Sequence, residues 1–225
     1  MSEEIENKVA MVIMAHPDDA EFSCAGTVAK WRQDGWDVYY VICTDAGSGG
    51  PDEATDVGPE ARLKISETRR TEQRAAAKVL GLKDVIFLDY RDGELQPTLE
   101  FRRNMVRLLR TYKPYRVICQ SPERSWTPQM YIGAYHPDHR ACGEGVISAL
   151  YPASQNPWDF PELMAEGLLP HKVKELYVVG TPNQNHWVDI SDTMDVKIEA
   201  LMAHASQFGE RAADVAQRVR EQRAT

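Results

Sequence analysis

The stretch Val9–Glu21, VAMVIMAHPDDAE, decides what fold the chain is expected to adopt. From Lys8 to Met14 the sequence is an apolar run of β-branched and large aliphatic residues, which is typical of a buried strand. After Ala15 it turns polar, and the apolar spacing over Ala20–Asp34 then predicts a helix. The buried face of that helix would carry Phe22, Ala25, Val28, Ala29 and Trp31. A strand, a polar turn and a helix in this order place the turn at the carboxyl edge of a parallel sheet, where α/β folds bind ligands.

This turn carries one imidazole and two adjacent carboxylates, from His16, Asp18 and Asp19. Two of these groups can bind a divalent metal while the third stays free for proton transfer. The alternative is that Pro17, Asp18 and Asp19 only start and cap the helix. A cap explains one carboxylate, but it does not explain the second carboxylate and the preceding histidine.

A second His-Pro-Asp lies in Tyr135–Gly143, YHPDHRACG, after the strand-like run Tyr115–Cys119 and a loop. Both turns can reach the same sheet edge, so we expect them to build one site. A set of three metal ligands, His16, Asp19 and His139, leaves a position for water, as a catalytic zinc site requires.

The remaining groups of the two turns have the chemistry that hydrolysis needs. Asp18 is suited to be a general base, and His136 to be an acid or an oxyanion partner. Asp138 would orient an imidazole through a hydrogen bond.

These motifs resemble those of the PIG-L/LmbE-like zinc-dependent N-acetyl-sugar deacetylases. The first family signature, AHPDD followed by Glu, stands at Ala15–Glu21, and the second, His-Pro-Asp-His, stands at His136–His139. The resemblance extends over about residues 8–208. Its softer matches are Arg69, Glu72, Asp92-Gly93, Val188-Asp189-Ile190, Lys197, Ala200-Leu201 and His204-Ala205-Ser206-Gln207.

The resemblance implies an enzyme that removes the acetyl group from an N-acetylated amino sugar of the N-acetylglucosamine type. It implies one Zn²⁺ per chain, substrate contacts at Arg69, Asp92 and His204, and self-association, with hexamers among the family. Each substrate residue also has a plain structural interpretation: Arg69 could pair with Glu72 on a helix surface, Asp92 could belong to a simple turn, and His204 could be a packing residue.

The expected reaction is hydrolysis of the acetamide. The metal would lower the pKa of water towards ~7. Asp18 would take the proton of the attacking water, and the metal and a protonated His136 would stabilise the oxyanion. The sequence leaves open whether Asp18 or His136 protonates the leaving amine. It also leaves open the metal, because Fe²⁺, Co²⁺ or Ni²⁺ suit the same ligands.

The rest of the chain alternates strand and helix patterns with helix-length crossovers. This predicts a three-layer, Rossmann-like α/β fold with a mostly parallel sheet, in one domain over residues 1–225. Further strands are expected at Asp37–Thr44, Asp84–Asp89, Val173–Val179 and Trp187–Ile190. Helices are expected at Ala61–Leu80, Leu99–Tyr112, His139–Leu150 and Asp192–Phe208, with residues 209–225 as a tail or a further helix.

Two expectations concern which helix faces are buried. In Ala61–Leu80 the core contacts would be Leu63, Ile65, Ala75, Ala76, Val79 and Leu80. In Leu99–Tyr112 the basic face would be solvated, and it consists of Arg102, Arg103, Arg107 and Arg110.

Three irregular stretches are expected at the edge of the site or on the surface. The loop Asp45–Glu60 contains neither GxGxxG nor GxxxxGK[ST], so it indicates a substrate rim rather than a phosphate site. The aromatic stretch Gln120–Tyr135 would form a pocket wall. The stretch Asn156–Pro170 would be a lid or an oligomer surface.

Composition limits the partners and the compartment. The 225 residues carry a formal charge of −8, which argues against nucleic acid or an anionic membrane as a partner. No apolar run approaches the ~20 residues that span a bilayer, and the start MSEEIENK has no signal-peptide character. The four cysteines occur singly, without a CxxC pair, as expected of free thiols in a reducing compartment such as the cytoplasm.

Three alternatives to a sugar deacetylase stay open from the residues alone. The same metal site could serve an amidase that acts on another N-acyl or thiol-conjugate amide. The fold could be a nucleotide-binding module without hydrolytic activity, although the phosphate fingerprint is missing. The metal could also be regulatory or structural, but the spare Asp18 favours catalysis.

Overall fold

The chain forms one five-stranded parallel sheet in the order β3-β2-β1-β4-β5. This is seen in a computed structural model that describes residues 7–124, 126 and 135–221. The strands are β1 (Val9–Met14), β2 (Asp37–Thr44), β3 (Asp84–Tyr90), β4 (Arg116–Gln120) and β5 (Glu175–Val179). The chain starts at the centre, extends to β3 on one side and then crosses to β4 on the other. The carboxyl ends of β1 and β4 therefore flank the point where the strand order reverses, which is where open α/β sheets bind ligands.

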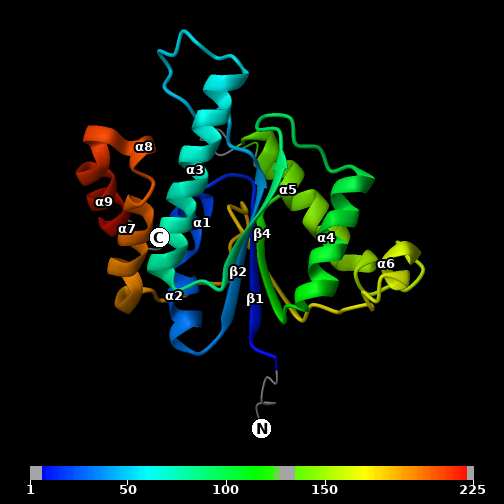
Figure 1. Ribbon diagram of the computed structural model, residues 1–225. Helices are drawn as coiled ribbons and strands as arrows, with labels where there is room; N and C mark the ends of the chain where they lie inside the picture. The colour runs from blue at the N-terminus through cyan, green and yellow to red at the C-terminus, as the bar shows by residue number, and fades with distance from the viewer. Residues whose placement is uncertain (1–6, 125, 127–134, 222–225) are drawn as a thin grey trace.

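The helices cover both faces of the sheet (Figure 1). One face carries α4, α5 and α6, and the other carries α1, α2, α3 and α7 to α9. Their bounds are α1 (Asp19–Ser23), α2 (Ala25–Gln33), α3 (Pro59–Leu80), α4 (Leu99–Tyr112), α5 (Pro137–Ser148), α6 (Pro161–Ala165), α7 (Met194–Met202), α8 (Ala205–Phe208) and α9 (Ala212–Glu221). Short irregular turns lie at Ala149–Ala153, Ser191–Thr193 and Gly209–Arg211. This arrangement confirms the predicted three-layer α/β fold.

The central strand β1 supplies both hydrophobic cores. Successive side chains of a strand point to opposite faces of the sheet. Met11 and Ile13 therefore pack in the core beneath α4 and α5, whereas Val12 and Met14 pack in the core beneath α2 and α3. All four are fully buried, as the uninterrupted apolar run predicts for a strand covered on both faces.

Two glycines allow α5 to approach the sheet closely. A Cβ on Gly143 would lie 2.3 Å from the carbonyl oxygen of Gln120, and a Cβ on Gly145 would lie 2.3 Å from the ring of Phe101. Because both positions lack a side chain, α5 packs directly on β4 and α4. This packing brings the first turn of α5 to the carboxyl ends of β1 and β4.

The predicted helix Ala20–Asp34 is divided into α1 and α2. Cys24 lies between them with non-helical angles, φ −135° and ψ 4°. The hydroxyl of Ser23 donates to the carbonyl oxygen of Asp19 at 2.6 Å, a side-chain bond that competes with regular helix. Because of the break, Phe22 does not share the buried face and is 43% exposed, with its ring against Phe208.

Two predictions about helix faces are wrong in part. Arg110 is only 1% exposed, because its guanidinium donates to the carbonyl oxygens of Ala153, Ser154, Asn156 and Asp159, which satisfy the buried charge. On α3, the predicted core contacts of Ala76, Val79 and Leu80 are confirmed, whereas Leu63 and Ala75 face solvent.

The other differences lie toward the C-terminus. Trp187–Ile190 is not a strand, since it pairs with none of the described strands. The predicted helix Asp192–Phe208 ends at Met202, and α8 follows after His204. Beyond residue 209 the chain forms α9. Most of the aromatic stretch between Gln120 and Tyr135 lies outside the described residues. Among the helices that the structure describes, none is both long and apolar enough to cross a membrane.

Candidate active site

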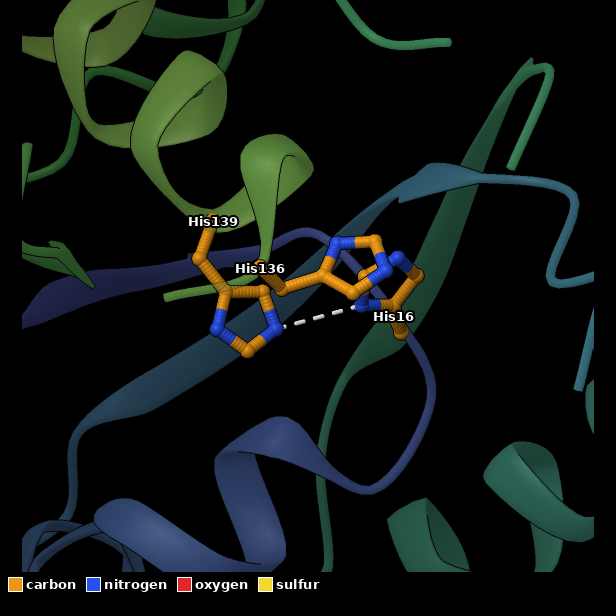
Figure 2. Close-up of side chains that lie close together, drawn as sticks. All are labelled: His16, His136 and His139. Carbon is orange, nitrogen blue, oxygen red and sulfur yellow. Dashed lines mark hydrogen bonds between the residues drawn. The ribbon is translucent and has the colours of Figure 1, made fainter. Parts of the chain in front are cut away.

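Both His-Pro-Asp turns meet at the carboxyl edge of the sheet. His16 follows β1, whereas His136 and His139 stand at the start of α5 (Figure 2). The ring centroids of His16 and His136 are 4.6 Å apart, and those of His16 and His139 are 5.2 Å apart. The expectation that the two turns share one location is therefore confirmed.

Three donor groups converge at the distances of a metal site. Nδ1 of His16 lies 3.2 Å from Nε2 of His139 and 3.4 Å from Oδ2 of Asp19, and Nε2 of His139 lies 3.1 Å from Oδ1 of Asp19. Ligands on a tetrahedral zinc ion with bonds of about 2.0–2.1 Å are about 3.3–3.4 Å apart. Two imidazole nitrogens and a carboxylate at this spacing can hold a divalent cation.

The other nitrogen of His16 faces two carboxylates. Its Nε2 lies 3.1 Å from Oδ2 of Asp138 and 3.2 Å from Oδ1 of Asp92. Burial lowers the pKa of His16, but hydrogen bonds to Asp138, Asp19 and Asp92 outweigh burial and hold that pKa well above its usual range. His16, Asp92, His136 and Asp138 form a second group of side chains that could hold a cation.

Asp138 is fully buried and joins α5 to the turn after β3. Its two oxygens accept from the backbone N–H groups of Gly93 at 2.7 Å and Leu95 at 3.1 Å. Burial raises the pKa of this carboxyl, but the hydrogen bonds from His16 and Gly93 outweigh burial and hold that pKa below its usual range. Asp138 therefore stays ionised, with Oδ2 3.1 Å from Nε2 of His16, and its role in orienting that ring stays a prediction.

Asp18 is held in an uncommon conformation beside Arg69. Its φ of +79° lies in the left-handed region, which non-glycine residues seldom adopt. The Arg69 guanidinium donates to Oδ2 of Asp18 at 2.9 Å and to the carbonyl oxygen of Pro17 at 2.7 Å. Burial raises the pKa of Asp18 to about 6, although the charge of Arg69 opposes the shift.

His136 caps the N-terminus of α5. Its Nδ1 accepts from the backbone N–H of Asp138 at 3.2 Å, so the neutral ring carries its hydrogen on Nε2. Burial lowers the pKa of His136, and the neighbouring charge of His16 lowers it further. The Nε2 edge of the ring, which has no hydrogen bond to the other described residues, is thus a neutral N–H donor.

The residues predicted to bind substrate occupy three different environments. Arg69 lies beside Asp18, and its Nε and Nη1 have no hydrogen-bond partner among the described residues. Asp92 contacts His16 and accepts from the backbone N–H of Ser48 at 2.9 Å. His204 is fully buried, with Nε2 3.4 Å from Oε2 of Glu21. A ring enclosed in this way has no surface open to a substrate, so the structure gives no support to that role of His204.

Two glutamines that contact the first turn were not predicted as site residues from the sequence. Gln120 donates to Oδ2 of Asp19 at 3.0 Å, and Gln73 accepts from the backbone N–H of Asp18 at 3.2 Å. Gln73 also donates to Oε1 of Glu21, the glutamate of the first signature, at 3.1 Å. No local pattern marks these glutamines, because they lie 101 and 55 residues from the carboxylate or backbone group that they contact.

Comparisons with known proteins agree with this geometry. Residues 11–150 match the PIG-L family, described as GlcNAc-PI de-N-acetylase. The chain is 37% identical over 203 residues to a diacetylchitobiose deacetylase of Thermococcus kodakarensis, covering 90% of this chain and 71% of the relative. It is 30% identical over 207 residues to a probable N-acetyl-α-D-glucosaminyl L-malate deacetylase 2 of Bacillus anthracis, covering 88% of this chain and 80% of the relative.

A solved structure is also similar. The N,N′-diacetylchitobiose deacetylase of Pyrococcus horikoshii, in complex with its inhibitor MPG, superposes with a TM-score of 0.83 and 31% sequence identity. The match covers 96% of this chain and 77% of that chain. The paired His-Pro-Asp turns, the parallel sheet that brings them together and these similarities lead to one conclusion: the chain belongs to the PIG-L family.

Proposed function

We propose that the protein is a zinc-dependent N-deacetylase that hydrolyses the acetamide of an N-acetylglucosamine-type sugar. One observation carries this proposal: His16, Asp19 and His139 converge at 3.1–3.4 Å, while Asp18 of the same turn keeps a separate partner in Arg69. A metal site with a second carboxylate beside it is suited to hydrolysis. Family membership and the similar deacetylases support the same reaction.

His16, Asp19 and His139 would hold the zinc ion. The imidazole nitrogens suited to this are Nδ1 of His16 and Nε2 of His139, because Nε2 of His16 already faces Asp138. When bound, zinc acts as a Lewis acid and brings the pKa of water near neutrality.

Asp18 would be the general base. With a pKa of about 6, the carboxylate is mostly ionised at neutral pH and can still accept a proton readily. It takes a proton from the water whose oxygen bonds to the acetamide carbon. The protonated Asp18 then gives that proton to the amine nitrogen as the C–N bond breaks, which leaves acetate and the free amino sugar.

His136 would stabilise the oxygen that becomes negative during the attack. Because its Nδ1 accepts from the backbone of Asp138, the Nε2–H is free to donate to that oxygen. The geometry favours a neutral donor over the protonated ring expected from the sequence. A neutral His136 has no spare proton for the amine, which supports Asp18 as the acid of the second step.

Substrate contacts at Arg69 and Asp92 stay predictions. Nη1 of Arg69 lies 3.7 Å from Oε2 of Glu72, but neither it nor Nε has a hydrogen-bond partner among the described residues, which supports such a role because a buried guanidinium is stabilised by further acceptors such as sugar hydroxyls. The contacts of Asp92 with His16 support a role in orienting that ring as well.

The experiment is an acetate-release assay with controlled metal content. The purified protein is stripped of metal and reloaded with Zn²⁺, Fe²⁺, Co²⁺ or Ni²⁺. It is then offered N-acetylglucosamine, N,N′-diacetylchitobiose and a glycosidic N-acetylglucosamine conjugate. We expect acetate release that disappears on stripping and returns with zinc. Zinc binding without acetate from any of these sugars would contradict the proposed substrate class, and full activity of the stripped protein would contradict the metal.

A further inference from the structure

The two carboxylates of the first turn are each attached to a different glutamine. Gln120, at the end of β4, spans the gap to β1: its Oε1 accepts from the backbone N–H of Ala15 at 3.0 Å, and its Nε2 donates to Oδ2 of Asp19 at 3.0 Å. The backbone N–H of His16 donates to the same Oδ2 at 2.8 Å. With Oδ2 held by two donors, Oδ1 of Asp19 is the oxygen that faces His139.

Gln73 lies in the middle of α3, on the face of the sheet that carries α1 and α2, and approaches the turn from that side. Its Oε1 accepts from the backbone N–H of Asp18, and its Nε2 donates to Oε1 of Glu21. Gln73 and Glu21 are both fully buried, and the buried His204 ring lies behind Glu21 at ion-pair distance. A buried chain of polar groups thus runs from Asp18 through Gln73 and Glu21 to His204.

The partners fix the orientation of each amide. A carboxylate only accepts and a backbone N–H only donates, so each glutamine must turn its oxygen to the backbone and its nitrogen to the carboxylate. In Gln73 this arrangement satisfies the N–H of Asp18 while that residue is in the left-handed region. The backbone of Asp18, and with it the direction of its side chain, therefore depends on Gln73.

We infer that the two glutamines are positioning residues with separate tasks: Gln120 holds Asp19 for the metal, and Gln73, backed by Glu21, holds Asp18 for proton transfer. The Asp18 half of this inference rests on the proposed function. The Asp19 half rests only on metal binding.

The same substitution at both positions tests the separation. Gln120→Met removes both hydrogen bonds at similar volume, and we expect zinc affinity, measured by competition with a chelator, to fall about 10–100-fold. At saturating zinc its kcat should stay within about threefold of the wild-type value. Gln73→Met should leave zinc affinity within about threefold and lower kcat about 100-fold at nearly unchanged KM, because the base is misplaced. Gln33→Met, at an exposed site on α2, is the control for the substitution itself.

A swapped pair keeps the test valid if Gln73→Met folds poorly. Gln73→Glu places a second carboxylate against Glu21 and should lower kcat, because like charges in a buried site repel. Adding Glu21→Gln exchanges the amide and the carboxylate between the two positions. The new carboxylate at position 73 can accept from the backbone N–H of Asp18, and the new amide at position 21 can donate to that carboxylate. We expect kcat of the double variant to return to within about threefold of the wild-type value, while a merely space-filling role predicts no recovery.

Each result decides part of the inference. Loss of zinc affinity in Gln73→Met, unchanged zinc affinity in Gln120→Met, or failure of the swapped pair to recover kcat would overturn the separation of tasks. If the wild-type protein releases no acetate from any acetamido sugar, the proposed function and the Gln73 half fail together. The zinc affinities would still confirm or overturn the Gln120 half.

Discussion

The two His-Pro-Asp turns have the same three residues but begin their helices at different points. In the first turn, Asp18 is the residue before α1 and adopts a left-handed conformation, so His16 stands outside the helix. In the second, His136 itself caps α5, Pro137 is the first helical residue and Asp138 lies inside the first turn. The helix start is displaced by two residues relative to the tripeptide.

This displacement accompanies different environments for equivalent side chains. His16 lies between His139 on one side and the carboxylates of Asp92 and Asp138 on the other. His136 instead has one ring nitrogen without a hydrogen bond to the other described residues. Asp18 lies beside Arg69 with a raised pKa, whereas Asp138 is fully buried with a lowered pKa. A tripeptide motif therefore does not define a role by itself. The backbone that carries it decides which group can bind metal, move a proton or support a neighbour.

The largest expected effect separates the two histidines. His16→Ala removes a proposed metal ligand, so the protein should lose its zinc and its activity should fall to background. His136→Ala should keep its zinc and lose about 10²–10³ in kcat, the usual loss for one oxyanion donor. Metal content by mass spectrometry and acetate release measure both. Equal metal loss in the two variants would remove the distinction.

For the two aspartates, the substitution in the first turn should lower kcat and the substitution in the second turn should weaken zinc binding. Asp18→Asn should retain zinc and lose about 10²–10⁴ in kcat, the range for a general base. Asp138→Asn should instead weaken zinc binding by about 10–100-fold, since it supports the His16 ring. Chelator competition and steady-state kinetics distinguish these outcomes. Near-normal turnover of Asp18→Asn would refute its role as the base.

The pH dependence of kcat/KM reports on Asp18 as well. Burial raises its pKa to about 6, and only the ionised form accepts a proton. The rate should therefore fall as pH drops through the folded-state pKa, by about tenfold per unit, and level off above it. A bound dication lowers the pKa of Asp18, so the midpoint should lie at or below about 6. A midpoint above pH 7 would be inconsistent with this assignment. So would the same fall at low pH in the residual activity of Asp18→Asn.

The smallest expected effect concerns the helix that carries the second turn. Gly143→Ala places a methyl group 2.3 Å from the backbone of Gln120, so α5 must move away from β4. We expect a stability loss of about 1–3 kcal/mol, as is usual for overpacking. Gly49→Ala is the control, because a Cβ there makes only ordinary contacts. Chemical denaturation measures both, and equal stability of the two variants would show that α5 does not need this close approach.

Much of this arrangement could be predicted from the sequence because its signals are local. The apolar run of β1, the pattern over Asp37–Thr44 and the amphipathic spacing over Leu99–Tyr112 each fall within one element, and each prediction is confirmed. The two His-Pro-Asp turns are equally local. Since strands in a parallel sheet end at one edge, the meeting of the turns also followed from the alternation of strands and helices.

The features that were missed depend on long-range contacts. Gln73 and Gln120 gain their roles only when α3 and β4 are packed beside the first turn. Arg110 has the sequence pattern of a solvated residue, but distant carbonyl oxygens enclose it. Trp187–Ile190 was predicted as a strand, yet it pairs with none of the described strands. In each case the sequence specifies the side chain and the tertiary contacts specify its environment.

The most direct test of the account is a crystal structure of the zinc-loaded protein with anomalous scattering at the zinc edge. The account predicts one strong peak within about 2.0–2.2 Å of Nδ1 of His16, a carboxylate oxygen of Asp19 and Nε2 of His139, with Asp18 close by but not bonded to it. A peak bonded instead to Nε2 of His16 together with Asp92 or Asp138 would contradict it. That result would place the metal on the other side of the His16 ring, away from Asp19 and His139, and leave the division between the two turns without support.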